Sequence, residues 1–244
     1  MRLIFILLLS PLFFSICTYA QPAKTIVNIS FVNKAGDRLL QLDTTYTNPF
    51  GEEFTVKKLK YYISNISFIN SKDEEKKLIP SYYLIDESNA ETKSFTVNVA
   101  KDNYKKICFF IGVDSIKNVS GTQTDALDPM NGMFWTWNSG YINAKLEATS
   151  PVAKTPTRLV EYHIGGFRIN QNTVRKITLP LSSAAFNFSE KNNFHIIVEA
   201  DINKWFKGVH DLKISANAVC TTPGNLAVQF ADNYAEMFKI ANSN

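Results

Sequence analysis

Three histidines are the residues of this sequence best suited to hold a metal ion, because a neutral imidazole is a strong nitrogen ligand. They are His163, His195 and His210. In "EYHIGGF", strand alternation places His163 on the same face as Glu161, and in "NFHIIVEAD" it places His195 with Glu199, opposite the apolar residues. A site built from imidazoles requires two or more of these side chains to meet in space. For a histidine that stays alone, a structural role is the simpler interpretation.

The segment "GMFWTW" supplies a soft ligand and two of the chain's three tryptophans. Alternation places Met133, Trp135 and Trp137 on one face of a strand. A methionine thioether combined with imidazoles favours Cu(I), which is a soft ion. The aromatic side chains could instead stack on sugars or fill the core, and core packing is the simplest interpretation on physical grounds.

Oxygen-bearing side chains are concentrated in "GVDSIKNVSGTQTDALDPMNG", where Asp114, Asp125, Asp128 and Asn131 lie. Carboxylate and amide oxygens are the ligands of hard cations such as calcium. The spacing fits no EF-hand, and Asp and Asn are also common in ordinary turns. We therefore interpret the segment as turn chemistry, with a calcium loop as the alternative.

Two cysteines, Cys108 and Cys220, lie in the apolar runs "KKICFFIGV" and "ISANAVC". They could form one disulfide in an oxidising compartment, or they could be buried free thiols. The sequence contains no CxxC pair, no G-x-S-x-G elbow and no H-E-x-x-H motif. We therefore expect a protein that binds a ligand and is not an enzyme.

The elements that must position these residues are mainly β-strands. Apolar residues recur at every second position in about ten short runs, among them "KTIVNISFVN" and "KYYISNISFIN". This pattern predicts an all-β, single-domain β-sandwich of immunoglobulin-like or barrel-like type. A short helix is expected near residues 201–208. A C-terminal helix is expected with Thr222 as its cap, Pro223 at its first position, and Phe230 and Tyr234 on one face.

Residues 1–20, "MRLIFILLLSPLFFSICTYA", have the pattern of a secretory signal, with one basic residue, an apolar run and small residues at the cleavage site. We expect residues 21–244 to form the mature domain, exported to the periplasm or out of the cell. The whole chain has a formal net charge of +4. This excess is too small to indicate a nucleic-acid or membrane-surface partner. No second apolar segment is long enough to span a bilayer.

The stretch "FIGVDSIKNVSGTQTDALDPMNGMFWTWNSGYINAKLEATS", followed by "EYHIGGF", closely resembles the copper-binding MbnP-like family. The resemblance continues in "KLKYYISNISF", "FHIIVEADINKWFKG" and "ADNYAEMFKI". It implies an exported β-sandwich whose histidines hold copper together with kynurenine, an oxidised tryptophan made by a diheme enzyme of the MauG type. Trp135 and Trp137 match the family's F-W-x-W segment, His163 matches its H-x-G segment, and His195 is the next position of interest.

The sequence departs from some copper-binding relatives in one respect, because it contains no W-x-H. Trp135 and Trp137 are then structural residues of the signature. We expect an exported carrier or scavenger of Cu(I), with His163 as first ligand, His195 as second, and Met133 or His210 completing the site. The alternative is a surface module that recognises a glycan or a protein through exposed aromatic side chains. Its candidate residues are Tyr61, Tyr62, Tyr82, Tyr83 and Trp205.

Overall fold

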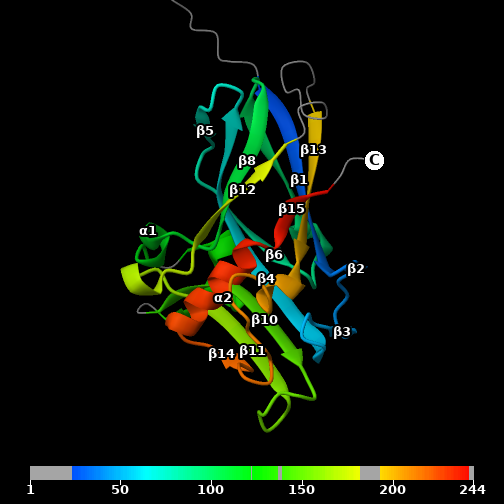
Figure 1. The fold of residues 1–244 in the computed structure, drawn as a ribbon. Helices are drawn as coiled ribbons and strands as arrows, with labels where there is room; N and C mark the ends of the chain where they lie inside the picture. The colour runs from blue at the N-terminus through cyan, green and yellow to red at the C-terminus, as the bar shows by residue number, and fades with distance from the viewer. Residues whose placement is uncertain (1–23, 122, 137–138, 182–192, 242–244) are drawn as a thin grey trace, which may run out of the picture.

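The fold is a sandwich of two β-sheets with one longer helix, as the sequence pattern predicted (Figure 1). The computed structural model describes residues 24–121, 123–136, 139–181 and 193–241. The expected signal at residues 1–20 and Trp137 therefore lie outside the described residues. Fifteen strands are present in the described part of the chain, more than the ten expected. The additional ones include strands of two or three residues, which are too short to show a period of two.

The smaller sheet contains β1 (Lys24–Ala35), β2 (Arg38–Leu39), β7 (Ser94–Ala100), β13 (Asn193–Asp201) and β15 (Phe238–Ile240). Its centre is the parallel pair β1 and β13, and β7 pairs antiparallel with the other side of β1. Buried and more exposed residues alternate along β1 and β13 because one face of this sheet is packed on the core and the other meets solvent.

The larger sheet is built around the long strand β4. Its main order is β12-β8-β4-β10-β11-β14, with β3, β5 and β6 pairing with β4 and β9 pairing with β10. The bounds are β3 (Thr45–Thr47), β4 (Glu53–Asn70), β5 (Glu75–Lys77), β6 (Tyr82–Asp86), β8 (Tyr104–Ile111), β9 (Phe134–Thr136), β10 (Gly140–Thr149), β11 (Leu159–Gly165), β12 (Arg175–Pro180) and β14 (Val219–Cys220).

Helical segments are few and mostly short. They are α1 (Ser115–Asn118), α2 (Asn225–Ala235), and the 3₁₀ helices η1 (Ala90–Lys93), η2 (Asp125–Leu127), η3 (Pro129–Asn131), η4 (Ile169–Gln171) and η5 (Ile202–Trp205). The expected short helix near residues 201–208 is η5, and the expected C-terminal helix is α2. Helix α2 lies against β11, β12 and η5 (Figure 1).

The start of α2 differs from the sequence prediction. The first intrahelical hydrogen bond runs from Val228 N to Gly224 O at 3.0 Å, so Gly224 is the N-cap residue. Thr222 and Pro223 both precede the helix, and the prediction that they are its cap and first residue is wrong. The predicted apolar face is confirmed, since Phe230 and Tyr234 are fully buried. They pack on aromatic residues, with ring centroids 4.4 Å apart for Tyr162–Phe230 and 5.5 Å for Trp205–Tyr234.

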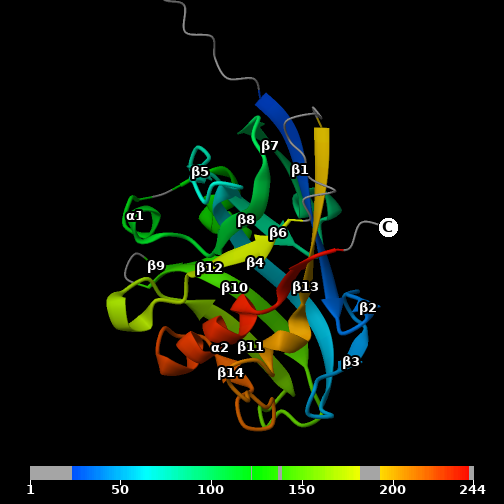
Figure 2. The same cartoon turned by 45° about the horizontal axis from the view of Figure 1, so that its top comes forward.

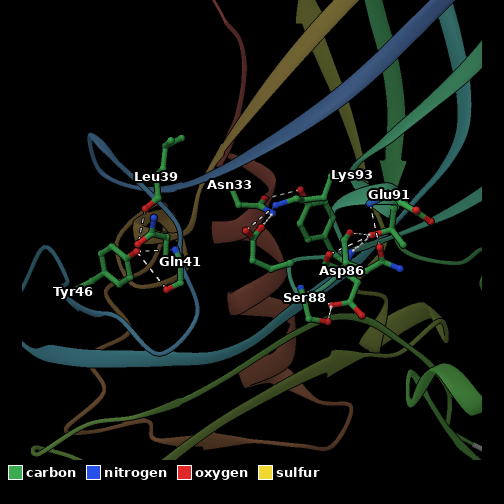
Figure 3. Close-up of polar contacts among 12 residues, drawn as sticks. Asn33, Leu39, Gln41, Tyr46, Asp86, Ser88, Glu91 and Lys93 are labelled. Atoms are coloured by element: carbon green, nitrogen blue, oxygen red, sulfur yellow. Dashed lines mark hydrogen bonds and ion pairs between the residues drawn. The ribbon is translucent and has the colours of Figure 1, made fainter.

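A small set of buried polar contacts joins the two sheets beside the apolar core. The Tyr61 hydroxyl of β4 donates to Asn33 Oδ1 of β1 at 2.8 Å, and Asn33 Nδ2 donates to Glu87 Oε2 at 2.7 Å. Lys93 pairs with Glu87 at 2.8 Å (Figure 3). These bonds satisfy polar groups that would be costly to bury alone.

Cys108 and Cys220 are free thiols, so the disulfide alternative is not realised. Cys108 lies on β8 and Cys220 on β14, and both side chains are buried. Four interstrand spacings separate β8 from β14 in the larger sheet, or about 19 Å at about 4.8 Å each. A disulfide requires Cα atoms closer than about 7 Å.

Among the described residues, no helix combines the length and apolar character needed to cross a membrane.

Candidate metal-binding site

His163 lies on the outer face of the larger sheet, in the middle of β11. Its neighbour Tyr162 is fully buried and points into the core, so alternation directs His163 away from it. Lys145 on β10 is its partner across the sheet. The His163 ring Nε2 lies 2.9 Å from Glu147 Oε1, also on β10. The side chain of His163 is only 17% exposed.

Glu147 connects the histidine to two lysines. Its carboxylate is 2.8 Å from Lys58 Nζ and 3.9 Å from Lys145 Nζ. Burial alone would raise the pKa of Glu147, but the hydrogen bonds from Lys58 and His163 outweigh it and leave that pKa below its usual value. Glu147 is therefore ionised at neutral pH. One hint of this partner is present in the sequence, because Lys145 and Glu147 are the two charged residues of the run "YINAKLEA".

The imidazole of His163 is neutral at neutral pH. Burial and then the nearby charge of Lys145 lower the pKa of His163, and the opposing effect of Glu147 is smaller. A neutral ring with one nitrogen bonded to a carboxylate is the state in which histidines ligate metals, because the carboxylate fixes the orientation of the ring. With Nε2 bonded to Glu147, Nδ1 is the nitrogen that can act as a ligand.

Trp135 packs on Gly165 of β11. Gly165 follows His163 by two residues on the same face of β11, about 7 Å along the strand. A Cβ added at Gly165 would lie 2.7 Å from Cζ3 of Trp135 and 2.5 Å from the carbonyl oxygen of Tyr141. Only glycine leaves room for the indole here. The segments "GMFWTW" and "EYHIGGF" are therefore in contact.

Met133 belongs to a second apolar cluster on the same face, which we call the outer cluster. Its buried members are Tyr62, Val113, Leu127, Met133, Tyr141 and Ile142. Met133 is fully buried, and its carbonyl oxygen accepts a 2.8 Å bond from Ile142 N. Lys145 Nζ donates to the carbonyl oxygen of Gly132 at 2.5 Å. Met133 therefore occupies the position of a packing residue within the outer cluster.

The other two histidines lie elsewhere. His195 is on the solvent face of the smaller sheet, where its Nε2 is 2.8 Å from Ser30 Oγ. His210 lies beside α2, with its Nε2 3.1 Å from Asp232 Oδ2. His163 and His195 face outward from opposite sheets, so the sandwich, whose two sheets pack about 10 Å apart, separates them. The described residues contain no group of three or more His, Cys, Asp or Glu side chains arranged to hold a metal ion.

The oxygen-rich segment uses its side chains to stabilise turns. Asp114 Oδ1 accepts from Lys117 N at 3.1 Å, and Asp128 Oδ1 accepts from Met130 N at 2.8 Å. Asn131 Nδ2 donates to the carbonyl oxygen of Asp125 at 2.9 Å. These contacts are the turn chemistry that the sequence favoured, and a calcium loop remains a prediction.

The aromatic platform expected under the recognition alternative is wrong for three of its five residues. Tyr61, Tyr62 and Trp205 are fully buried. Tyr62 is covered by the outer cluster, so adjacent residues of β4 are buried on both faces of the sheet. Tyr82 and Tyr83 are half-buried, and Tyr83 stacks on Phe95 with ring centroids 3.5 Å apart. No observation therefore favours this alternative.

Comparisons with known proteins agree with the fold. The sequence model of the family described as MbnP matches residues 24–222. The structure is similar to MbnP from Methylosinus trichosporium, with a TM-score of 0.60, 13% sequence identity, and coverage of 84% of this chain and 87% of that one. A comparison with curated proteins gives no match. The family match extends over most of the sandwich and includes the His163, Glu147 and Trp135 region, and the chain belongs to the MbnP family.

Proposed function

We propose that this chain is an exported copper-binding protein that carries or scavenges Cu(I), with His163 as its principal ligand. Membership of the MbnP family and the resemblance of the "GMFWTW" and "EYHIGGF" segments support copper as the ion. The observation that carries the choice of residue is the 2.9 Å contact between His163 and Glu147, which orients a neutral imidazole. Binding is proposed without catalysis, since the sequence contains no motif for a reaction.

The charges around His163 are nearly balanced. Lys58 and Lys145 both approach Glu147, and Lys60 pairs with Asp86 at 2.8 Å. Attraction to the carboxylates and repulsion from the ammonium groups both grow in proportion to the charge of a bound cation, so electrostatics does not select that charge. The choice of Cu(I) rests on the family resemblance, and imidazole is a suitable ligand for it.

Trp135 is the described tryptophan to inspect for oxidation. Its indole lies on Gly165, one same-face position from His163. A modification by a diheme enzyme of the MauG type would therefore change the surroundings of the proposed ligand. The intact mass of protein isolated from its native host would reveal the increase in mass that accompanies conversion of tryptophan to kynurenine.

The test is a titration of the metal-free, leader-free protein with Cu(I) against a competing chelator. His163→Ala should weaken binding about tenfold or more. His195→Ala and His210→Ala are the matched controls, because each removes an imidazole that is hydrogen-bonded elsewhere on the surface. Unchanged affinity in His163→Ala would remove His163 from the site. Absence of binding by the unmodified and the native-host protein would reject copper as the cargo.

A further inference from the structure

A groove runs along one open seam of the sandwich, between edge strands of the two sheets. One wall consists of residues 96–100 of β7, and the facing wall consists of residues 76–81, which are the end of β5 and the loop that leads to β6. The groove has a volume of about 450 Å³. Figure 2 shows β7 next to β1 at the end of the molecule where β5 also lies.

The wall formed by β7 is a backbone edge. Side chains of a strand alternate between its two faces, so five consecutive residues can border one groove only through the edge of the strand. In the described part of the chain, β7 pairs with β1 alone. Its other edge therefore offers main-chain donors and acceptors to an added strand.

A hydrogen bond identifies the residues that face the groove. The Tyr104 hydroxyl donates to the carbonyl oxygen of Ala100 at 3.0 Å, so this carbonyl points away from β1. The N–H and C=O of one residue point to the same side of an antiparallel strand, and the side alternates along the chain. Thr96 and Asn98 therefore share the outward direction of Ala100.

The floor and rim of the groove indicate what it binds. Val97 and Val99 of β7 are buried beneath it, and Ile79 on the facing wall is 88% exposed. The charged residues that line the groove are all lysines: Lys24, Lys76 and Lys77. Lys76 pairs with Glu74 at 2.9 Å, while Lys24 and Lys77 form no ion pair among the described residues. An apolar floor with a positively charged rim is complementary to an extended chain that carries acidic and apolar side chains.

We propose that the free edge of β7 binds an acidic, extended peptide segment of a partner protein, which adds as a further strand to the smaller sheet. Thr96 and Asn98 supply main-chain hydrogen bonds, Ile79 supplies an apolar contact, and Lys24 and Lys77 supply the charge selection. A second copy of this chain fits less well, because pairing two β7 edges would place the same lysines of both copies at one seam. The proposal does not depend on copper binding.

The first test uses a short fluorescent peptide that alternates glutamate with valine or threonine. Fluorescence anisotropy with the leader-free protein should show saturable binding that weakens as salt is raised. The same peptide with lysine in place of glutamate should bind about tenfold more weakly. Equal binding of the two peptides, or no binding of either, would overturn the proposal. Concentration-dependent dimerisation that blocks the peptide would overturn it in favour of a second copy.

The second test distinguishes the strand edge from other surfaces. Asn98→Pro removes the outward N–H, and proline is tolerated in an edge strand when its nitrogen faces solvent. Asn98→Ala is the matched control, because it keeps the N–H and removes only the side chain. We expect about tenfold weaker peptide binding for Asn98→Pro and no change for Asn98→Ala. The exposed pair Lys24→Glu and Lys77→Glu provides an independent variant that should also weaken binding. Wild-type affinity in Asn98→Pro would refute strand addition.

Discussion

Gly165→Ala tests whether the contact between the two signature segments shapes the outer face of the larger sheet. The added methyl group would lie 2.5 Å from the carbonyl oxygen of Tyr141 and 2.7 Å from Cζ3 of Trp135. The first neighbour is backbone of β10, which is held against β11 by strand pairing next to Ile142. Relief therefore requires β10 to move or the indole of Trp135 to move away from Gly165.

The expected cost follows from these contacts. Overpacking of a rigid site costs about 1–3 kcal/mol, and the upper part of that range applies because one of the two clashes involves backbone. Replacing glycine by alanine also reduces the entropy of the unfolded chain, which offsets about 0.4–1 kcal/mol. We expect the free energy of unfolding to fall by about 1–2 kcal/mol, and copper affinity to fall with it if Trp135 moves.

Urea unfolding, followed by tryptophan fluorescence, measures this cost as a lower midpoint with an unchanged slope. Trp135→Leu in the Gly165→Ala background removes the ring atoms that clash but leaves the clash with Tyr141. The two substitutions should therefore be non-additive, with the double variant losing less than the sum of the single losses. A Gly165→Ala protein as stable as wild type, or strictly additive losses, would refute the proposed contact.

Three further predictions concern stability and the thiols. Tyr61→Phe should lower the free energy of unfolding by about 1 kcal/mol because it removes a buried hydrogen bond, whereas Tyr62→Phe should be neutral or stabilising because the buried Tyr62 hydroxyl has no partner among the described residues. Denaturant midpoints of both variants check this pair, and an equal loss would contradict it. Glu52→Gln should cost about 2 kcal/mol at pH 7, since hydrogen bonds hold the pKa of the Glu52 carboxylate below its usual value against the opposing effect of burial. A carboxylate whose pKa is lowered in the folded state stabilises the fold at pH values above its unfolded pKa, and this effect is lost as the pH falls. The stability difference between Glu52→Gln and wild type should therefore shrink below about pH 4. A stability difference that does not change with pH would refute this prediction. Cys108 and Cys220 should react with a thiol reagent only on unfolding, and a reductant should leave the unfolding midpoint unchanged.

Period-two alternation predicted the sandwich because most strands have one face on the core and one face in solvent. It placed Phe194, Ile196 and Val198 inward and His195 outward, as the structure has them. The same rule failed at Tyr61 and Tyr62, which are adjacent and both fully buried. β4 is covered on both faces there, since the outer cluster packs on its second face. Alternation cannot reveal a strand whose outer face is covered by a distant loop.

The candidate site depended on register, which a single sequence does not contain. His163 and Glu147 are sixteen residues apart, and they meet because Glu147 lies opposite Glu161 and Lys145 lies opposite His163. A shift of one residue between β10 and β11 would send Glu147 to the core face and leave the histidine without its carboxylate. The separation of His163 from His195 could not be predicted for a related reason. Alternation assigns a residue to one face of its strand, but it does not say which sheet the strand joins.

The separation of the histidines also limits what kind of copper site is compatible with this fold. A site that needs two imidazoles within bonding distance of one ion cannot use His163 together with His195, because they face outward from different sheets. Under the proposed function, the imidazole of His163 therefore acts with donors other than His195. The proposal therefore predicts loss of copper binding on His163→Ala with no loss on His195→Ala. The β7 edge belongs to the smaller sheet, whereas His163 belongs to the larger one. Asn98→Pro should accordingly leave copper affinity unchanged, and His163→Ala should leave peptide affinity unchanged, so that failure of either proposal can be recognised without the other.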